Sequence, residues 1–127
     1  MISKGAMKMQ FICYPKCSTC QKAKKWLQEH NVKFQERNIV ENHPSYEELE
    51  IWYRKSGLPL KKFFNTSGLL YKEKQLKDKL PAMSETEQLK LLASNGMLIK
   101  RPLLINEDTI LVGFKEKEWM EQLTWQK

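Results

Sequence analysis

Apolar and polar positions follow two different periods in the first forty residues. Residues 9–13 form a short apolar run, and apolar positions then recur every three or four residues from 20 to 30. The run suits a buried strand, whereas the longer spacing predicts an amphipathic helix. Residues 32–40 return to a strand pattern. A strand, a helix and a strand in so few residues predict a βαβ unit with parallel strands and a right-handed crossover.

The middle of the chain carries helix signals and no strand signal. Ser45 with Glu48, and Ser84 with Glu87, have the spacing of a capping box, and a glycine follows each pattern. In a capping box the serine and the glutamate satisfy backbone N–H groups at the start of a helix. The stretch between these two helices is weakly helical and rich in lysine. Residues from about 42 to 96 are therefore predicted to be a helical insert.

Strand patterns return near the C-terminus. Apolar runs at 102–105 and 109–112 are separated by three turn residues, which predicts a hairpin. Residues 115–123 predict a closing helix with Trp119, Met120 and Leu123 on one side.

The order of these elements predicts the fold class. The outer pieces, βαβ and ββα, together make an α/β protein with a thioredoxin-like fold and a mixed four-stranded sheet. Residues 9–127 are expected to form one domain that carries the helical insert. Residues 1–8 are expected to be a disordered leader or a tag.

Composition narrows the class of protein. The chain is 41% apolar and 29% charged, as in ordinary globular proteins. No apolar run approaches the roughly 20 residues that span a membrane, and the N-terminus lacks the apolar region of a signal peptide. A cytoplasmic protein without a membrane partner is expected. The net charge is +7, but the lysines are spread along the chain without interleaved aromatic residues, so no direct nucleic-acid partner is predicted.

Two cysteines in a C-x-x-C pattern, Cys17 and Cys20, lie where the first strand gives way to the first helix. The N-terminal end of a helix stabilises a thiolate, and the positive charge of Lys16 favours it further. Cys17 is the expected nucleophile because it precedes the helix, and Cys20 is the expected resolving thiol one turn later. Ser18 or Thr19 is expected to cap the helix.

Two other interpretations of the pair remain open. A zinc site needs two more ligands, and the other candidates, which are Cys13, His30 and His43, form no second paired motif, so no metal is predicted. The two thiols alternatively serve only for packing. Cys13 ends the first strand and is expected to be a buried small hydrophobe, with a part in oxidation as the alternative.

Two polar sites elsewhere are candidates for binding substrate. In a thioredoxin-like fold, the proline that opens the third strand, Pro102, faces the cysteines, and its peptide bond is cis. Arg101 then offers a planar fork to an anion or a substrate backbone, unless it is simply exposed before a rigid turn. The loop that begins at Asn65 either caps a helix or brings amide and hydroxyl donors to a ligand.

Three sequence blocks carry a family resemblance. They are YPKCSTCQKA at 14–23, SGLPLKKFFNTSG at 56–68 and IKRP at 99–102. In this order and at these separations they resemble the ArsC/Spx family, over about residues 9–119. That family comprises glutaredoxin-linked arsenate reductases and Spx-type transcriptional regulators. The resemblance implies a thioredoxin-like fold with an inserted helical subdomain.

The resemblance also implies roles for single residues. In the arsenate reductases the cysteine that matches Cys17 attacks arsenate, and three arginines hold the oxyanion. Arg101 matches one of them, whereas the other two fall at Asn65 and near Phe114. These reductases also usually lack a thiol at the position of Cys20.

These departures favour a cytosolic thiol–disulfide oxidoreductase over an arsenate reductase. Its expected partner is a disulfide-bearing protein or a small oxidised substrate. It needs no bound cofactor, only an external thiol reductant, either glutathione with glutaredoxin or the thioredoxin system. An Spx-type redox-sensing regulator that binds the RNA polymerase α subunit is the alternative. A glutaredoxin-dependent arsenate reductase is the third interpretation.

Overall fold

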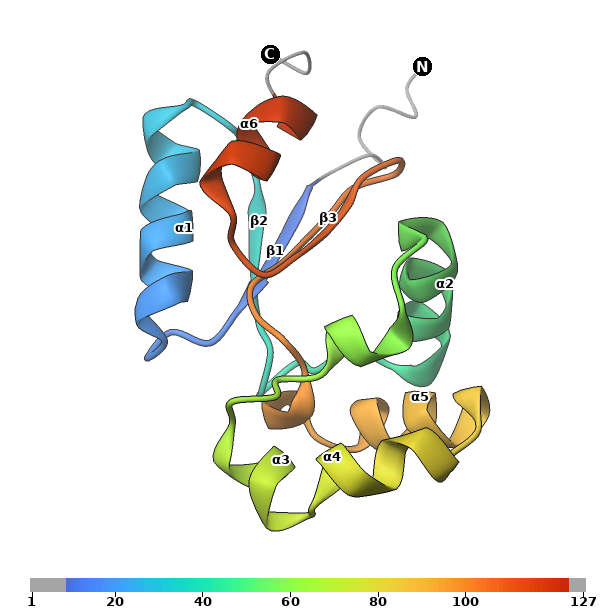
Figure 1. Cartoon of the computed structure of the whole chain (residues 1–127). Coiled ribbons are helices and arrows are strands. Elements are labelled where there is room, and N and C mark those ends of the chain that lie inside the picture. Colours follow the sequence, from blue (N-terminus) through green and yellow to red (C-terminus); the bar gives the residue numbers. More distant parts are fainter. Residues whose placement is uncertain (1–8, 124–127) are drawn as a thin grey trace. The chain divides into compact units, whose positions relative to one another are not determined.

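The computed structural model describes residues 9–123, which divide into two compact units (Figure 1). The predicted leader at 1–8 lies outside the described residues. One unit joins the residues up to Asn38 to those from Arg101 onward, and the other, a helical unit, spans Ile39–Lys100. The elements of the first unit are β1 (Gln10–Cys13), α1 (Ser18–Glu29), β2 (Gln35–Asn38), β3 (Leu103–Ile105), β4 (Ile110–Val112) and α6 (Glu116–Leu123).

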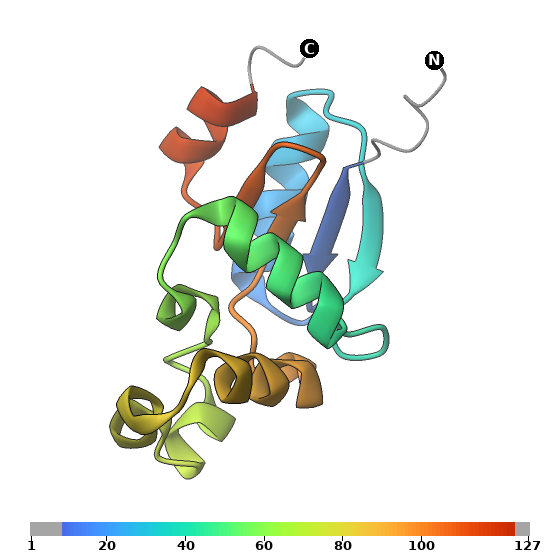
Figure 2. The same cartoon turned by 90° about the vertical axis from the view of Figure 1, so that its right-hand side faces the viewer.

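The first unit is built on a mixed four-stranded sheet with the order β2-β1-β3-β4. β1 and β2 are parallel, while β3 is antiparallel to both β1 and β4. Figure 2 shows β1 in blue between β2 and the orange hairpin of β3 and β4. This sheet and its helices confirm the predicted α/β class and the thioredoxin-like fold.

The second strand is shorter than the predicted 32–40. Asn31 has a left-handed backbone (φ 57°), and the N–H of Val32 donates to the carbonyl of Leu27 at 3.0 Å. This turn follows the helix end directly and delays the pairing with β1 until Gln35.

Helices α1 and α6 cover the same face of the sheet (Figure 1). Successive strand residues point to opposite faces, so Phe11 and Cys13 share the face that meets these helices. The core between sheet and helices also contains Cys20, Ala23, Trp26, Leu27, Leu104, Leu111, Trp119 and Leu123.

The predicted buried face of the closing helix is partly wrong. Trp119 and Leu123 are buried, but Met120 is 38% exposed. Residues four apart lie on one side of a helix, whereas the next residue is turned away by about 100°. The buried face of α6 is therefore the one that Trp119 and Leu123 share, and Met120 lies off it.

The helical unit combines α-helices with three short 3₁₀ turns, two between its helices and one after the last of them. Its elements are α2 (Tyr46–Ser56), η2 (Leu60–Phe63), α3 (Leu69–Glu73), α4 (Leu76–Lys79), η3 (Leu80–Ala82), α5 (Glu85–Ser94) and η4 (Gly96–Leu98). The weakly helical stretch splits at Gln75, whose φ of 54° is left-handed. Regular strands are lacking among the described residues of this unit, which has one isolated antiparallel bridge between Phe64 and Ile99.

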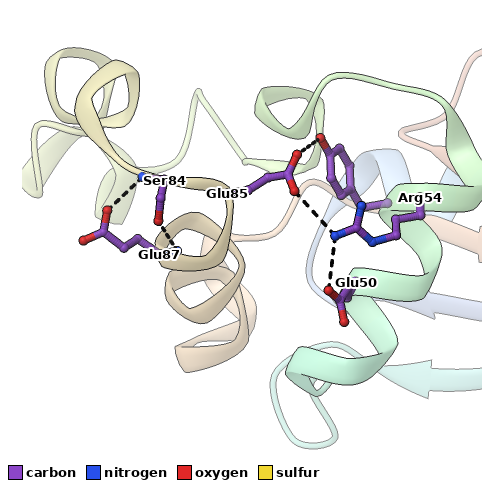
Figure 3. A network of polar contacts seen from close by, with 6 residues as sticks. Glu50, Arg54, Ser84, Glu85 and Glu87 are labelled. Atoms are coloured by element: carbon purple, nitrogen blue, oxygen red, sulfur yellow. Dashed lines mark hydrogen bonds and ion pairs between the residues drawn. The ribbon is translucent and has the colours of Figure 1, made fainter.

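Both predicted capping boxes are formed. The hydroxyl of Ser45 accepts from the N–H of Glu48 at 3.1 Å, and the carboxylate of Glu48 accepts from the N–H of Ser45 at 3.0 Å. Ser84 and Glu87 make the same pair at the start of α5 (Figure 3). Each box satisfies two backbone N–H groups that the helix cannot pair itself.

Polar contacts join α2 to α5. Glu85 accepts from the hydroxyl of Tyr53 at 2.7 Å and lies 3.6 Å from the guanidinium of Arg54, which also pairs with Glu50 at 3.3 Å (Figure 3). All of these side chains are substantially exposed, so each ion pair contributes at most about 1 kcal/mol. The buried side chains of Leu49, Trp52, Leu89 and Leu92 form the apolar part of the two helices.

Gly96 is predicted to tolerate no side chain. A Cβ there would overlap the backbone carbonyl of Ile39, which has no flexible end to move aside. Gly96→Ala should therefore destabilise the protein by roughly 3 kcal/mol or more in urea unfolding. Gly57→Ala is the matched control, because φ at Gly57 is 69° but nothing lies within 4 Å of the new Cβ; it should cost only about 1 kcal/mol. Equal losses for the two variants would contradict this account.

Candidate functional site

Cys17 stands at the start of α1. Its N–H donates to the carbonyl of Tyr14 at 2.9 Å, which closes the turn after β1. Its own carbonyl accepts the N–H of Gln21 at 3.1 Å, so Cys17 is the residue that caps the helix. The prediction of Ser18 or Thr19 as the cap is wrong, because the turn lets the helix begin at Ser18. The half-buried Cys17 thus lies at the helix end that stabilises negative charge.

Cys20 lies one turn further along α1 and is only 2% exposed. The N–H of Tyr14 donates to its sulfur at 3.3 Å. The thiol interacts with the side chains of both Cys13 and Cys17. A hydrogen bond with Cys13 and burial raise the pKa of the Cys20 thiol well above its ordinary value. Cys20 is therefore a protonated, sheltered thiol beside the more accessible Cys17.

Arg101 lies against the cysteine turn. Its guanidinium carbon is 5.2 Å from the centre of the Tyr14 ring, a cation–π contact. The same Tyr14 accepts the N–H of Cys17, so one residue connects Arg101 to the first thiol. The Arg101–Pro102 peptide bond is cis, as predicted. Tyr14 is absent from the predicted site residues, although it begins the sequence block YPKCSTCQKA that carries the family resemblance.

Lys16 and Asn65 are the other two predicted binding residues. Lys16 is exposed in the turn before α1. Asn65 belongs to the helical unit, where its N–H donates to Leu98 at 2.8 Å and its carbonyl accepts from Gly68 at 3.0 Å. These contacts fit the interpretation of this loop as a helix cap, since Gly68 caps α3. A part for Asn65 or Lys16 in binding substrate stays a prediction.

Cys13 is buried beside the predicted pair and has an acidic neighbour. Its sulfur lies 3.6 Å from a carboxylate oxygen of Glu36, and that carboxylate pairs with Lys24 at 2.9 Å. The expectation of a buried Cys13 is confirmed at 2% exposure. Glu36 and Lys24 form no motif in the sequence. Glu36 is placed by strand register, because it pairs with Phe11, which shares a sheet face with Cys13.

Residues 9–123, which the structure describes, contain no disulfide and no metal-binding cluster. All three cysteines are free thiols. Within that range no cluster of three or more His, Cys, Asp or Glu side chains is placed to hold a metal ion. None of the helices described is long and apolar enough to cross a membrane.

Comparisons with known proteins identify relatives of this chain. Residues 13–122 match the ArsC family. The uncharacterized protein YusI of Bacillus subtilis is 59% identical over 91% of this chain and 98% of its own. The global transcriptional regulator Spx of Enterococcus faecalis is 33% identical over 82% of this chain and 77% of its own. A solved structure described as a possible arsenate reductase from Streptococcus mutans is 46% identical with a TM-score of 0.81, over 86% of this chain and 92% of that chain.

The three thiols should differ in reactivity. Brief treatment of the native protein with N-ethylmaleimide should modify Cys17 at least roughly tenfold faster than Cys13 or Cys20, because only Cys17 is accessible. Labelling of Cys20 should stay slow until the pH is strongly alkaline, since the pKa of its thiol is raised. Peptide mass spectrometry over time measures all three rates. Similar rates for Cys17 and Cys20 in the folded protein would contradict the site described here.

Proposed function

The chain belongs to the ArsC family, and on this basis we propose that it is a thiol–disulfide oxidoreductase that reduces a protein disulfide or a small oxidised thiol compound. The observation that carries the proposal is the position of the two thiols. Cys17 caps α1 at its accessible end, and Cys20 lies one turn behind it within interaction distance. A nucleophile with a resolving thiol behind it is the arrangement that disulfide exchange requires.

Exchange proceeds in two displacements. The Cys17 thiolate attacks one sulfur of the substrate disulfide, forms a mixed disulfide and releases the other half as a thiolate. Cys20 then gives up its proton and attacks the Cys17 sulfur. This forms a Cys17–Cys20 disulfide and releases the second half of the substrate. The substrate gains two electrons and the dithiol loses two.

Burial of Cys20 orders these displacements. A thiol that is 2% exposed and holds its proton does not compete with Cys17 for the substrate. It reacts only with the sulfur that is brought beside it, the mixed disulfide on Cys17. An external thiol, from glutathione with glutaredoxin or from the thioredoxin system, then reduces the Cys17–Cys20 disulfide. Such donors belong to the cytoplasm, where we expect the protein to work.

The arginines of the chain argue against arsenate as the main substrate. The sequence has three, Arg37, Arg54 and Arg101. Arg37 donates to the side chain of Gln10 at 3.1 Å, and Arg54 pairs with glutamates on the helical unit. Arg101 is the arginine held at the cysteine turn. One guanidinium fork pairs with two oxygens and supplies one positive charge, which matches a carboxylate but leaves the other oxygens of a tetrahedral oxyanion without a cation.

A redox-sensing regulator is the second candidate. The 33% identity to a protein named global transcriptional regulator Spx favours it. In that role the Cys17–Cys20 pair would switch the binding of the RNA polymerase α subunit instead of turning over a substrate. The regulator predicts binding of purified α subunit that depends on oxidation, without multiple turnover of any disulfide.

Single cysteine variants test the proposed exchange. Cys17→Ser should reduce disulfide turnover to background, because the attacking thiol is lost. Cys20→Ser should stop turnover after the first displacement and accumulate one mixed disulfide per chain, visible as an added mass by intact-protein mass spectrometry. The Cys17→Ser/Cys20→Ser double variant is the control and should hold no adduct. Full activity of Cys17→Ser would refute the mechanism.

Arg101→Lys tests the binding role of the guanidinium fork. Lysine keeps the charge but loses the planar contact with Tyr14 and the two-donor geometry, so KM should rise about five- to tenfold, with a smaller effect on kcat. Arg54→Lys on the exposed face of α2 is the matched control and should leave both constants unchanged. Steady-state kinetics with a small disulfide measure them. An equal effect of the two substitutions would remove Arg101 from the site.

A further inference from the structure

Cys13 is a third thiol at the site, and the exchange proposed above leaves it without a part. It ends β1, immediately before the turn that carries Cys17. Its side chain points with that of Phe11 into the layer between the sheet and α1. Cys20 lies on the buried face of α1 in the same layer. Strand alternation and helix periodicity thus direct these two thiols toward each other.

Cys20 is within interaction distance of both other thiols. Its side chain interacts with that of Cys13 on β1 and with that of Cys17, three residues earlier in the chain. Cys13 and Cys20 are each 2% exposed, whereas Cys17 is half-buried at the helix end. The three thiols therefore differ in depth: Cys17 is accessible from solvent, whereas Cys20 and Cys13 are buried in the core. Attack by a thiolate on a disulfide sulfur needs a thiol within reach of that sulfur, and Cys13 meets this need at Cys20.

Cys13 also has a route for its proton. Its S–H donates to Glu36 on β2 at 3.6 Å, and Glu36 is paired with Lys24 on α1. The Glu36 side chain is 41% exposed, so a proton received there passes to water. The hydrogen bond with Cys20 lowers the pKa of the Cys13 thiol, against burial and the Glu36 carboxylate, which raise it; Lys24 lowers it slightly. This lowering of the pKa belongs to the reduced protein, because Cys20 has no S–H to donate once it is in a disulfide; the contact with Glu36 remains as the route for the proton.

We propose that Cys13 is a third redox thiol, which attacks Cys20 in the Cys17–Cys20 disulfide and converts it into a buried Cys13–Cys20 disulfide. The proposal rests on the proposed function, which supplies the first disulfide. In this step the Cys13 sulfur bonds to the Cys20 sulfur, the Cys17–Cys20 bond breaks, and Cys17 leaves as a thiolate. The Cys13 proton goes to Glu36 and then to water. No net oxidation occurs, so no further oxidant is needed.

The transfer changes what the oxidised protein does. Cys17 is again a free thiolate, while the two-electron oxidation is stored between two thiols that solvent does not reach. An external thiol can reduce the protein only after Cys17 has attacked Cys20 and re-formed the accessible Cys17–Cys20 disulfide from the buried Cys13–Cys20 disulfide. The oxidised protein therefore persists longer than one with an exposed Cys17–Cys20 disulfide. A long-lived oxidised state is compatible with a redox-sensing regulator as well as with an oxidoreductase.

Disulfide mapping of the oxidised wild-type protein tests the proposal. Trypsin separates Met9–Lys16, which holds Cys13, from Cys17–Lys22, which holds both other cysteines. After stoichiometric oxidation with hydroxyethyl disulfide, acid quenching and alkylation, a Cys13–Cys20 bond joins the two peptides and leaves Cys17 alkylated. A Cys17–Cys20 bond stays within one peptide. The proposal predicts that the two peptides are joined in the oxidised wild-type protein. In oxidised Cys13→Ser, Cys17 should stay in the disulfide with Cys20, so its alkylation should fall at least about tenfold.

The outcomes separate this proposal from the proposed function. The proposal that Cys13 is a redox thiol is overturned if the oxidised wild-type protein contains only the Cys17–Cys20 bond and its Cys13 is fully alkylated. That result would leave the exchange mechanism intact. Absence of the Cys17–Cys20 bond in Cys13→Ser overturns the exchange mechanism itself. Glu36→Gln should slow the appearance of the joined peptides at least about tenfold near neutral pH, with the rate recovering as the pH rises. An unchanged rate and pH profile would remove Glu36 from the proton route.

Discussion

The packing of α1 on the sheet is the constraint on which the chemistry of this protein depends. This packing holds Cys20, Ala23 and Leu27 in the core, whereas Cys17, which caps the helix, stays half-buried. It also brings Cys20 to Cys13 and excludes water from it, and the hydrogen bond with Cys13 together with burial raises the pKa of the Cys20 thiol. The contact between α1 and the sheet thus leaves Cys17 accessible and shelters Cys20. The C-x-x-C spacing alone does not produce this difference.

Strand pairing assembles the rest of the site from distant parts of the sequence. β3 runs antiparallel to β1 and brings Arg101 to the Tyr14 turn, while β2 runs parallel to β1 and brings Glu36 to Cys13. The thiol–carboxylate contact is made by Cys13 and the cation–π contact by the next residue, Tyr14, so both lie just before the cysteine pair in the chain. β1 and the turn after it therefore hold the Arg101 contact, the cysteine pair and the Glu36 contact in one small unit.

Local signals in the sequence predict much of this structure, because they depend on neighbouring residues. The two capping boxes, the hairpin and the C-x-x-C at a helix start are formed as their spacing requires. The left-handed break at Gln75 escapes prediction because it falls on a residue type that is not typical of that conformation, and the exposure of Met120 escapes it because Met120 and Trp119 are both spaced for one face with Leu123. Glu36 beside Cys13 is equally hidden, because only the register of two strands brings them together.

The central claim is that the dithiol reduces disulfides and that arsenate is at most a poor substrate. Its most direct test is turnover of hydroxyethyl disulfide and of arsenate by the same preparation, with the same glutaredoxin or thioredoxin donor system. The account predicts disulfide reduction that is lost in Cys17→Ser, with arsenate turnover close to the uncatalysed background. Cys17-dependent reduction of arsenate, with no turnover of the disulfide, would contradict it.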